Sequence, residues 1–441
     1  MLRTTTLSVA ALLGLALLAP SSAQAAGETC QGLPATVVGT EGQPLTGTEG
    51  ADVVVTNGAS QTRTLGGDDV VCVTGSSNPY VDTAAGDDVV VSTLAADAFS
   101  TVKLGPGSDR FTGSASSDVV YAGGKVSRVL DDLDRDVIDS GPANPEYGDY
   151  VVSGQPGQPN GDQVRVPGGE PGRGGSASTL ELHGLPDAGG SFDGSGGSEL
   201  VLETEGARRA SVDTVAGTWA TEAGTTSISG FADFTVVDRE GPRRLTFRGS
   251  GRDESLDVDL GSDPRLDVRL GGGEDRVVLR GDRLARRGTV LAGGAGRDGI
   301  GVVMVHRDVD LDLGRGRLVA GKPGQRVPVR ASGFEDAEVV AGRIDVRGTR
   351  GDNDIRAWGC SATVRALAGD DVVSPLTLVS DAYFECRSVR TRFEGGPGDD
   401  RLSGDAGRDV LIGGPGRDVA NGRSGRDTCS AEKMRRCEVR R

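Results

Sequence analysis

Four aspartates recur at nine-residue intervals near the C-terminal end of the chain: Asp400, Asp409, Asp418 and Asp427. Each is the sixth residue of a block with glycine in first and fourth place. The blocks are GGPGDDRLS (395–403), GDAGRDVLI (404–412), GGPGRDVAN (413–421) and GRSGRDTCS (422–430). Carboxylates repeated beside glycine-rich turns offer the hard oxygen ligands that calcium prefers. The chemistry that this spacing indicates is binding of a divalent cation.

Each block predicts a turn followed by a short strand. Its glycine-rich half can adopt positive φ at no steric cost and form a tight turn. The residues after the aspartate form a strand whose alternate side chain points inward. Two such units make one coil of 18 residues, so turns on the same side of the molecule lie two blocks apart.

This geometry stacks Asp400 on Asp418 and Asp409 on Asp427. Without a cation, each pair of carboxylates repels by about 1–4 kcal/mol. A divalent cation relieves the repulsion, and turn carbonyls can supply the other oxygens that calcium requires.

The four blocks resemble the RTX, or haemolysin-type, calcium-binding nonapeptide GGxGxDxUx. The resemblance implies an all-β fold: a right-handed parallel β-roll or β-solenoid with short strands and Gly/Asp-rich turns. It also implies that Ca2+ binds between successive coils, to the four aspartates and to turn carbonyls. The turn residues so implicated are Gly395, Gly396, Gly398, Gly404, Gly407, Gly413, Gly414 and Gly416. The sequence departs from the pattern at Asp405 and Arg423, which replace the second glycine.

Looser copies of the rhythm begin near the N-terminus, at Asp52, Asp69, Asp88 and Asp109. Their spacings are 17, 19 and 21 residues, and Asp118 follows nine residues after the last. The spacing predicts stacked strands with one inward column: Val54, Val71, Val90 and Phe111. The glycine pattern is incomplete here, so these aspartates are either cation ligands or acceptors of turn hydrogen bonds.

A longer duplication occupies the centre of the chain. Residues 229–237 match residues 332–340, and each copy leads to a Gly/Asp turn followed by valines, at Asp275 and at Asp371. The duplication predicts two units of roughly 100 residues built from similar coils. Asp298 lies in an intact GGAGRD block but has no evident neighbour in register, so the sequence predicts a plain turn there.

The organisation of the whole chain follows from these segments. A basic start, an apolar run over 7–18 and a small-residue cleavage site predict a signal peptide over 1–25, and hence a secreted protein. Degenerate coils are expected over 26–124, an irregular Gly/Pro-rich region over 125–200 and duplicated solenoid units over 201–394. The calcium-binding array occupies 395–430 and a C-terminal cap 431–441.

Six cysteines in an exported chain predict disulfides. Zinc binding is the alternative, but the sequence contains no CxxC motif that would indicate it. Proximity in the sequence favours the pairs Cys30–Cys72, Cys360–Cys386 and Cys429–Cys437.

Composition narrows the function. A net charge of −16 disfavours nucleic acid and anionic lipid as partners, and no apolar run predicts a membrane span. No HExxH or GxSxG motif occurs, and neither His183 nor His306 belongs to a catalytic pattern. We therefore expect a noncatalytic extracellular calcium-binding protein. Two alternatives stay open: a cell-surface adhesin or matrix spacer with a cell-surface or polysaccharide partner, and a carbohydrate-active β-helix enzyme. The enzyme would need clustered acidic and basic residues in a groove.

Overall fold

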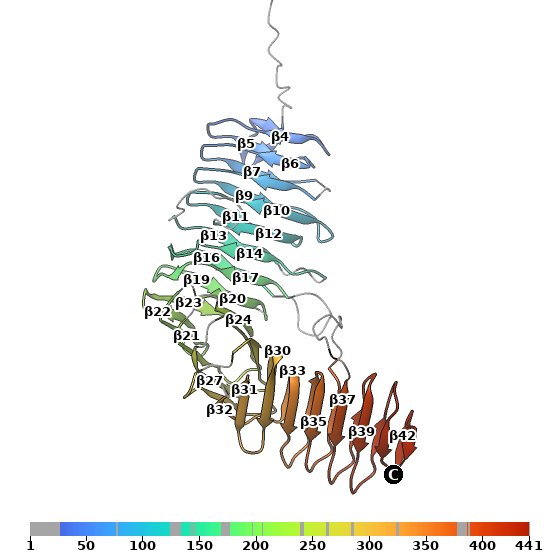
Figure 1. Ribbon diagram of the computed structural model, residues 1–441. Helices are drawn as coiled ribbons and strands as arrows, with labels where there is room; N and C mark the ends of the chain where they lie inside the picture. The colour runs from blue at the N-terminus through green and yellow to red at the C-terminus, as the bar shows by residue number, and fades with distance from the viewer. Residues whose placement is uncertain are drawn as a thin grey trace, which may run out of the picture.

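The computed structural model describes residues 27–75, 78–123, 134–142, 144, 146–168, 177–195, 197–204, 206–238, 242–261, 264–283, 286–322, 326–376, 386 and 389–440. These residues form strands and turns and contain no helix, so the all-β prediction is confirmed. Hydrogen bonds join 39 short strands into one sheet that winds through the molecule. Figure 1 shows the strands stacked as the rungs of a long solenoid. Among the described residues, no helix is long and apolar enough to cross a membrane.

The first half of the solenoid has two opposed faces of parallel strands. Face 1 stacks β3 (Val37–Val38), β5 (Val53–Val55), β7 (Val70–Val73), β9 (Val89–Ser92), β11 (Arg110–Thr112), β13 (Val137–Asp139), β16 (Gln163–Arg165), β19 (Ser191–Asp193) and β23 (Thr225–Ser229). Face 2 stacks β4 (Pro44–Thr46), β6 (Gln61–Arg63), β8 (Tyr80–Asp82), β10 (Phe99–Lys103), β12 (Ser117–Ala122), β14 (Tyr150–Ser153), β17 (Thr179–Leu182), β20 (Glu199–Glu203) and β24 (Asp233–Asp238). Two small sheets flank them, β1 (Thr29–Cys30) with β2 (Leu33–Pro34) and β15 (Pro159–Asn160) with β18 (Leu185–Pro186).

Both faces continue to the C-terminal end. Face 2 proceeds through β26 (Ser255–Leu260), β28 (Arg276–Gly281), β30 (Gly299–Asp312), β33 (Asp336–Arg347), β34 (Asp354–Trp358), β36 (Val372–Ser374), β38 (Arg401–Ser403), β40 (Val419–Asn421) and β42 (Lys433–Arg435). Face 1 proceeds through β21 (Arg209–Asp213), β25 (Arg244–Arg248), β27 (Arg265–Gly272), β29 (Val290–Ala295) and β32 (Val327–Ser332), then through the second halves of β30 and β33, and ends with β35 (Ser361–Arg365), β37 (Arg390–Glu394), β39 (Arg408–Ile412), β41 (Thr428–Ser430) and β43 (Val439–Arg440).

The core is a thin layer between the two faces, filled by alternate residues of each strand. Val54, Val71, Val90 and Phe111 lie in register on successive coils and are at most 1% exposed. The predicted inward column is therefore confirmed. β-Branched residues suit this layer, because a parallel sheet presents them to identical neighbours above and below.

Two antiparallel excursions on face 1 bend the solenoid. After β20 the chain runs forward to β21, back along β22 (Thr218–Thr221), and forward again as β23. The second half of β30, β31 (Arg317–Gly321) and β32 repeat this path. Each excursion places three strands on face 1 where face 2 has one. The central duplication has the same structural basis, since 229–237 and 332–340 both run from the last strand of an excursion into face 2.

The size of the bend follows from strand spacing. Two additional strands lengthen face 1 by about 10 Å, and packed sheets lie about 10 Å apart, so each excursion turns the stack by roughly 50°. Figure 1 shows the bend between two straight arms, with β22, β27 and β32 on its outer side.

The three predicted disulfides are all formed, with Cα–Cα distances of 5.5 Å for Cys30–Cys72, 5.3 Å for Cys360–Cys386 and 5.9 Å for Cys429–Cys437. The first joins the N-terminal hairpin to β7, and the last lies at the end of the final coils.

Candidate metal centre

The glycines of the C-terminal array are required by the turns that they form. Gly396, Gly398, Gly414 and Gly416 have φ of +126°, +144°, +128° and +156°. A Cβ on Gly416 would lie 1.8 Å from the Gly398 carbonyl oxygen of the coil below. Both the backbone conformation and the close approach of successive coils therefore exclude a side chain.

The first glycine of each block makes room for a carboxylate. A Cβ on Gly395 would lie 2.1 Å from Asp400 Oδ2, and a Cβ on Gly413 would lie 2.1 Å from Asp418 Oδ2. At Gly404 the corresponding distance, to Asp409 Oδ2, is 2.4 Å. Each aspartate side chain therefore folds back over the turn that precedes it.

The predicted stacking of the four aspartates is present. The backbone N–H of Asp400 donates to Asp418 Oδ1 at 2.9 Å, and that of Asp409 donates to Asp427 Oδ1 at 3.0 Å. All four side chains are buried. Each stack ends in a glutamate, because the N–H groups of Asp418 and Asp427 donate to Glu432 and Glu438, both at 2.7 Å.

One oxygen of each stacked carboxylate has no hydrogen-bond partner. These buried atoms are Oδ2 of Asp400, Asp418 and Asp427 and Oδ1 of Asp409. A buried charged oxygen without a partner is costly, and a cation is the usual remedy. Burial raises the pKa of Asp400 to about 6 and that of Asp409 to about 6, and the stacked partners Asp418 and Asp427 add to the increase. The residues present thus fit a hard divalent cation.

The hydrogen bonds from the backbone N–H of one turn residue to the carboxylate of the next coil form a ladder. This ladder extends far beyond the array. On the side of Asp400, the N–H of Asp371 donates to Asp400 Oδ1 at 2.9 Å, and that of Asn353 donates to Asp371 Oδ1 at 2.8 Å. In the N-terminal half, the N–H groups of Asp52, Asp69 and Asp88 each donate at 2.8 Å to the next aspartate, the last being Asp109. The N-terminal spacing therefore reflects true stacking of turns.

The prediction that Asp298 lacks a neighbour in register is wrong. The N–H of Asp275 donates to Asp298 Oδ1 at 3.0 Å, and the N–H of Asp298 donates to Glu335 Oε2 at 3.0 Å. These contacts span 23 and 37 residues, since coils at the bend are longer than the 18-residue period of the array.

Three ladder aspartates were not identified from the sequence: Asp136, Asp149 and Asp162. They accept N–H groups from Asp109, Asp118 and Asp136 of the preceding coils, at 2.9, 3.0 and 3.0 Å. Each precedes an apolar residue by two positions, in the order Ile138, Val151 and Val164. This aspartate-to-apolar spacing is the signal that could have located them.

A comparison with known protein families matches the RTX calcium-binding nonapeptide repeat, in four copies over residues 101–124 and 394–429. The chain carries RTX calcium-binding repeats. The second segment is the array described above, and the first contains Asp109 and Asp118 of the N-terminal RTX coils. A search of curated proteins finds no match.

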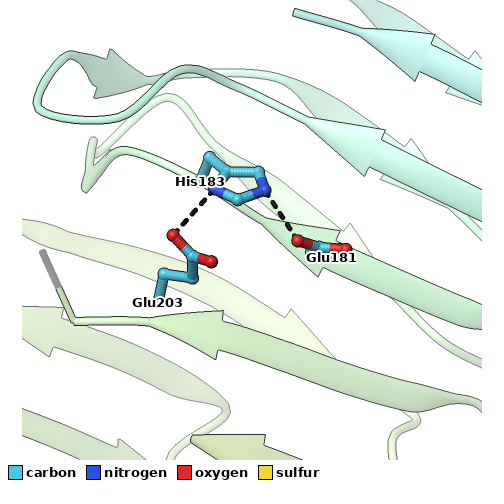
Figure 2. A group of neighbouring side chains, drawn as sticks. All are labelled: Glu181, His183 and Glu203. Carbon is cyan, nitrogen blue, oxygen red and sulfur yellow. Dashed lines mark hydrogen bonds and ion pairs between the residues drawn. The ribbon is translucent and has the colours of Figure 1, made fainter. Parts of the chain in front are cut away.

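A second cluster of ligand-type side chains lies beside β17 and β20, away from the RTX turns. The fully buried His183 places Nδ1 3.1 Å from Glu203 Oε2 and Nε2 2.9 Å from Glu181 Oε1 (Figure 2). A neutral imidazole donates from only one nitrogen, so both contacts are hydrogen bonds donated by the ring only when it is protonated. Because the two nitrogens face different carboxylates, His183 connects Glu181 beside it in the chain with Glu203 on the next coil. Sequence reasoning assigned His183 no site, since Glu203 lies twenty residues away.

Proposed function

We propose that this chain is an extracellular calcium-binding protein whose RTX array acquires its stable folded form when Ca2+ binds. The observation that carries the proposal is the set of buried, unpartnered carboxylate oxygens on Asp400, Asp409, Asp418 and Asp427. A bound calcium ion supplies the positive charge that these oxygens lack.

The aspartates would share the ion with backbone carbonyls of the turns. The glycines that form these turns are Gly395, Gly396, Gly398, Gly404, Gly407, Gly413, Gly414 and Gly416, and several of them adopt conformations open to glycine alone. Because the stacked turns exist only in the folded chain, cation binding and folding of the array are coupled. Extracellular calcium modules of this kind bind with dissociation constants of about 10⁻⁴–10⁻³ M.

Secretion is part of the proposal. Three formed disulfides favour an oxidising compartment outside the cytosol. The predicted signal peptide over 1–25 lies outside the described residues.

A structural role is favoured over the carbohydrate-active alternative by the state of the surface acids. Acidic and basic side chains do gather on the outer surface of β28, β33 and β34. There Arg297 binds Asp336 through two nitrogens, both at 2.8 Å, and Arg356 binds Asp354 at 2.9 Å. Arginines thus engage both carboxylates, an arrangement that does not favour their use as the acid and nucleophile of a glycosidase.

Calcium titration of the chelator-treated protein tests the proposal, with isothermal calorimetry and thermal unfolding followed by circular dichroism. The wild type should bind calcium and unfold at a higher temperature when calcium is present. The variant Asp409→Asn/Asp418→Asn should bind fewer ions and gain less. A wild type that neither binds calcium nor gains thermal stability contradicts the proposal.

A further inference from the structure

Two turns in the N-terminal half, 65–69 and 84–88, lie outside both segments that match the RTX repeat. Their backbones nevertheless follow the RTX turn. Four residues before each aspartate, Leu65 and Ala84 have φ of +79° and +68°, where the array has Gly396 and Gly414 at +126° and +128°. A non-glycine residue in this region costs about 1–2 kcal/mol. A positive φ therefore persists at this position although the glycine that eases it has been lost.

The coils also approach one another through the same atoms as in the array. Two residues before the aspartates, Gly67 and Gly86 have φ of +111° and +142°. A Cβ on Gly86 would lie 2.2 Å from the Gly67 carbonyl oxygen, as a Cβ on Gly416 would lie 1.8 Å from that of Gly398. The N-terminal turns are thus stacked RTX turns in shape, though not in sequence.

The carboxylates of these two turns, like those of the array, are buried and incompletely hydrogen-bonded. Asp69 and Asp88 are both 0% exposed, and the N–H of Asp69 donates to Asp88 Oδ1 at 2.8 Å. Oδ2 of each has no hydrogen-bond partner. Burial raises the pKa of these two carboxyls, and the hydroxyls of Thr64 and Thr83 lie close enough to Asp69 and Asp88 to lower it in part. The hydrogen bonds of these hydroxyls nevertheless go to carbonyl oxygens, of Thr83 at 2.9 Å and Leu104 at 2.7 Å, so they do not occupy the open oxygens.

In other turns of the ladder, donors from the protein hydrogen-bond to the second carboxylate oxygen. Asp52 Oδ2 accepts from the N–H and hydroxyl of Thr48 at 2.7 and 2.9 Å. Asp162 Oδ2 accepts the Ser153 hydroxyl at 2.6 Å. The ladder therefore contains two kinds of turn: some that are complete by themselves, and some, including those of Asp69 and Asp88, that leave an oxygen open.

We propose that a divalent cation, calcium by the hardness of its oxygen ligands, binds between the turns 65–69 and 84–88 through Asp69 and Asp88. The inference rests on the calcium chemistry of the proposed function but concerns a separate site in the N-terminal arm. The exposed Asp68 and Asp87 reinforce it, because they stack beside the site and add negative potential. The cation would stabilise the coils that Cys30–Cys72 anchors.

Hydrogen exchange of the full-length protein, with calcium and with chelator, tests the site. In the wild type, calcium at about ten times the dissociation constant should slow exchange of peptides covering 61–92 by about tenfold. The slowing should survive in Asp409→Asn/Asp418→Asn and vanish in Asp69→Asn/Asp88→Asn. Asparagine Oδ1 can still accept the ladder hydrogen bond, so the variant should fold, and its Cys30–Cys72 disulfide provides a check.

The matched control is Asp162→Asn, whose turn needs no cation and which should leave the calcium response of 61–92 intact. Protection by calcium confined to 395–430 in the wild type would overturn this site and leave the proposed function standing. Protection confined to 61–92 would support this site and contradict the proposed function. Loss of the response in Asp409→Asn/Asp418→Asn would also overturn an independent N-terminal site.

Discussion

The substitution Asp418→Asn tests the buried carboxylates directly, because its effect on stability should depend on calcium. Asp418 Oδ1 accepts the backbone N–H of Asp400 at 2.9 Å, and an asparagine Oδ1 can accept the same bond. The substitution therefore keeps the ladder and removes one negative charge from a stacked, buried pair.

The magnitude follows from the spacing of the coils. Neighbouring strands lie about 4.8 Å apart. At that separation two unit charges repel by about 0.9 kcal/mol in water and about 3.5 kcal/mol at an effective dielectric constant of about 20. At about pH 8, above the pKa of about 6 of Asp400, Asp418→Asn should raise the free energy of local unfolding in chelator by about 1–3 kcal/mol. Calcium at about a hundred times the dissociation constant should then raise the free energy of local unfolding of the wild type, relative to that of the variant, by about 2.7 kcal/mol.

Hydrogen exchange over residues 395–430 measures these local unfolding free energies in each condition. Asp162→Asn is the matched control, since the Asp162 carboxylate is already satisfied by Ser153 and the N–H of Asp136, and its effect should not change with calcium. Destabilisation of the array by Asp418→Asn in chelator would contradict repulsion between the stacked carboxylates. A difference between variant and wild type that calcium leaves unchanged would contradict a calcium ion at Asp418.

Three further outcomes are expected. Burial raises the pKa of Asp88 to about 7 in the calcium-free protein, against about 3.9 when unfolded. Because the folded state then binds more protons, the free energy of unfolding should fall from about pH 4 to about pH 7. Urea unfolding in chelator across this range should show the decrease, and a rise would contradict it. Gly396→Ala should lower stability by at least about 2 kcal/mol in thermal unfolding, because φ is +126° and the new Cβ would lie 1.5 Å from a backbone carbonyl oxygen. The control Gly251→Ala, whose Cβ would have no atom within 4 Å, should change stability by no more than about 0.5 kcal/mol. Replacing Cys429 and Cys437 by serine opens a loop of 8 residues and should cost about 2.5 kcal/mol, seen as faster exchange over 428–440; unchanged exchange there would show that the disulfide contributes nothing to the last coils.

The repeat period decided how much of the ladder could be predicted from the sequence. In the array the interval is constant, so the pairs Asp400–Asp418 and Asp409–Asp427 follow from counting. Over Asp52 to Asp109 the interval drifts slowly, and the apolar residue two positions later still reveals the register. The stacked strands and their inward column were therefore predictable.

The sequence could not show what the neighbouring coil supplies to each carboxylate. Asp69 and Asp162 look alike as aspartates before a short strand, yet only Asp162 finds a serine hydroxyl, from Ser153. Likewise, Leu65 replaces the glycine of the motif but keeps its positive φ, because the stacked coils on either side hold the turn. The excursions were also hidden, since the duplication revealed that two units match but not that each folds back on itself.

The distribution of open and complete turns corresponds to the shape of the molecule. Turns with an open oxygen occur in three runs: Asp69, Asp88 and Asp118; Asp275 and Asp298; and Asp371 to Asp427. Between the first two runs, near the first excursion, the turn residues before the face 2 strands include Ser178 and Ser198, whose hydroxyls donate to backbone carbonyls at 2.9 Å.

Between the second and third runs, after the second excursion, the turn residues include Asn353. Its side-chain amide donates to the Glu335 carbonyl oxygen at 2.7 Å, and its oxygen accepts the Thr349 N–H at 2.8 Å. A cation between coils requires two turns stacked in register, and an excursion inserts two further strands on face 1. Residues such as Ser178, Ser198 and Asn353, whose polar groups are paired within the protein, fit such places. Under the two proposals, calcium stabilises the regularly stacked coils, while the number of strands on each face sets the angle of the bend. Removal of calcium should therefore destabilise the stacked coils of the two arms and leave the angle of the bend unchanged.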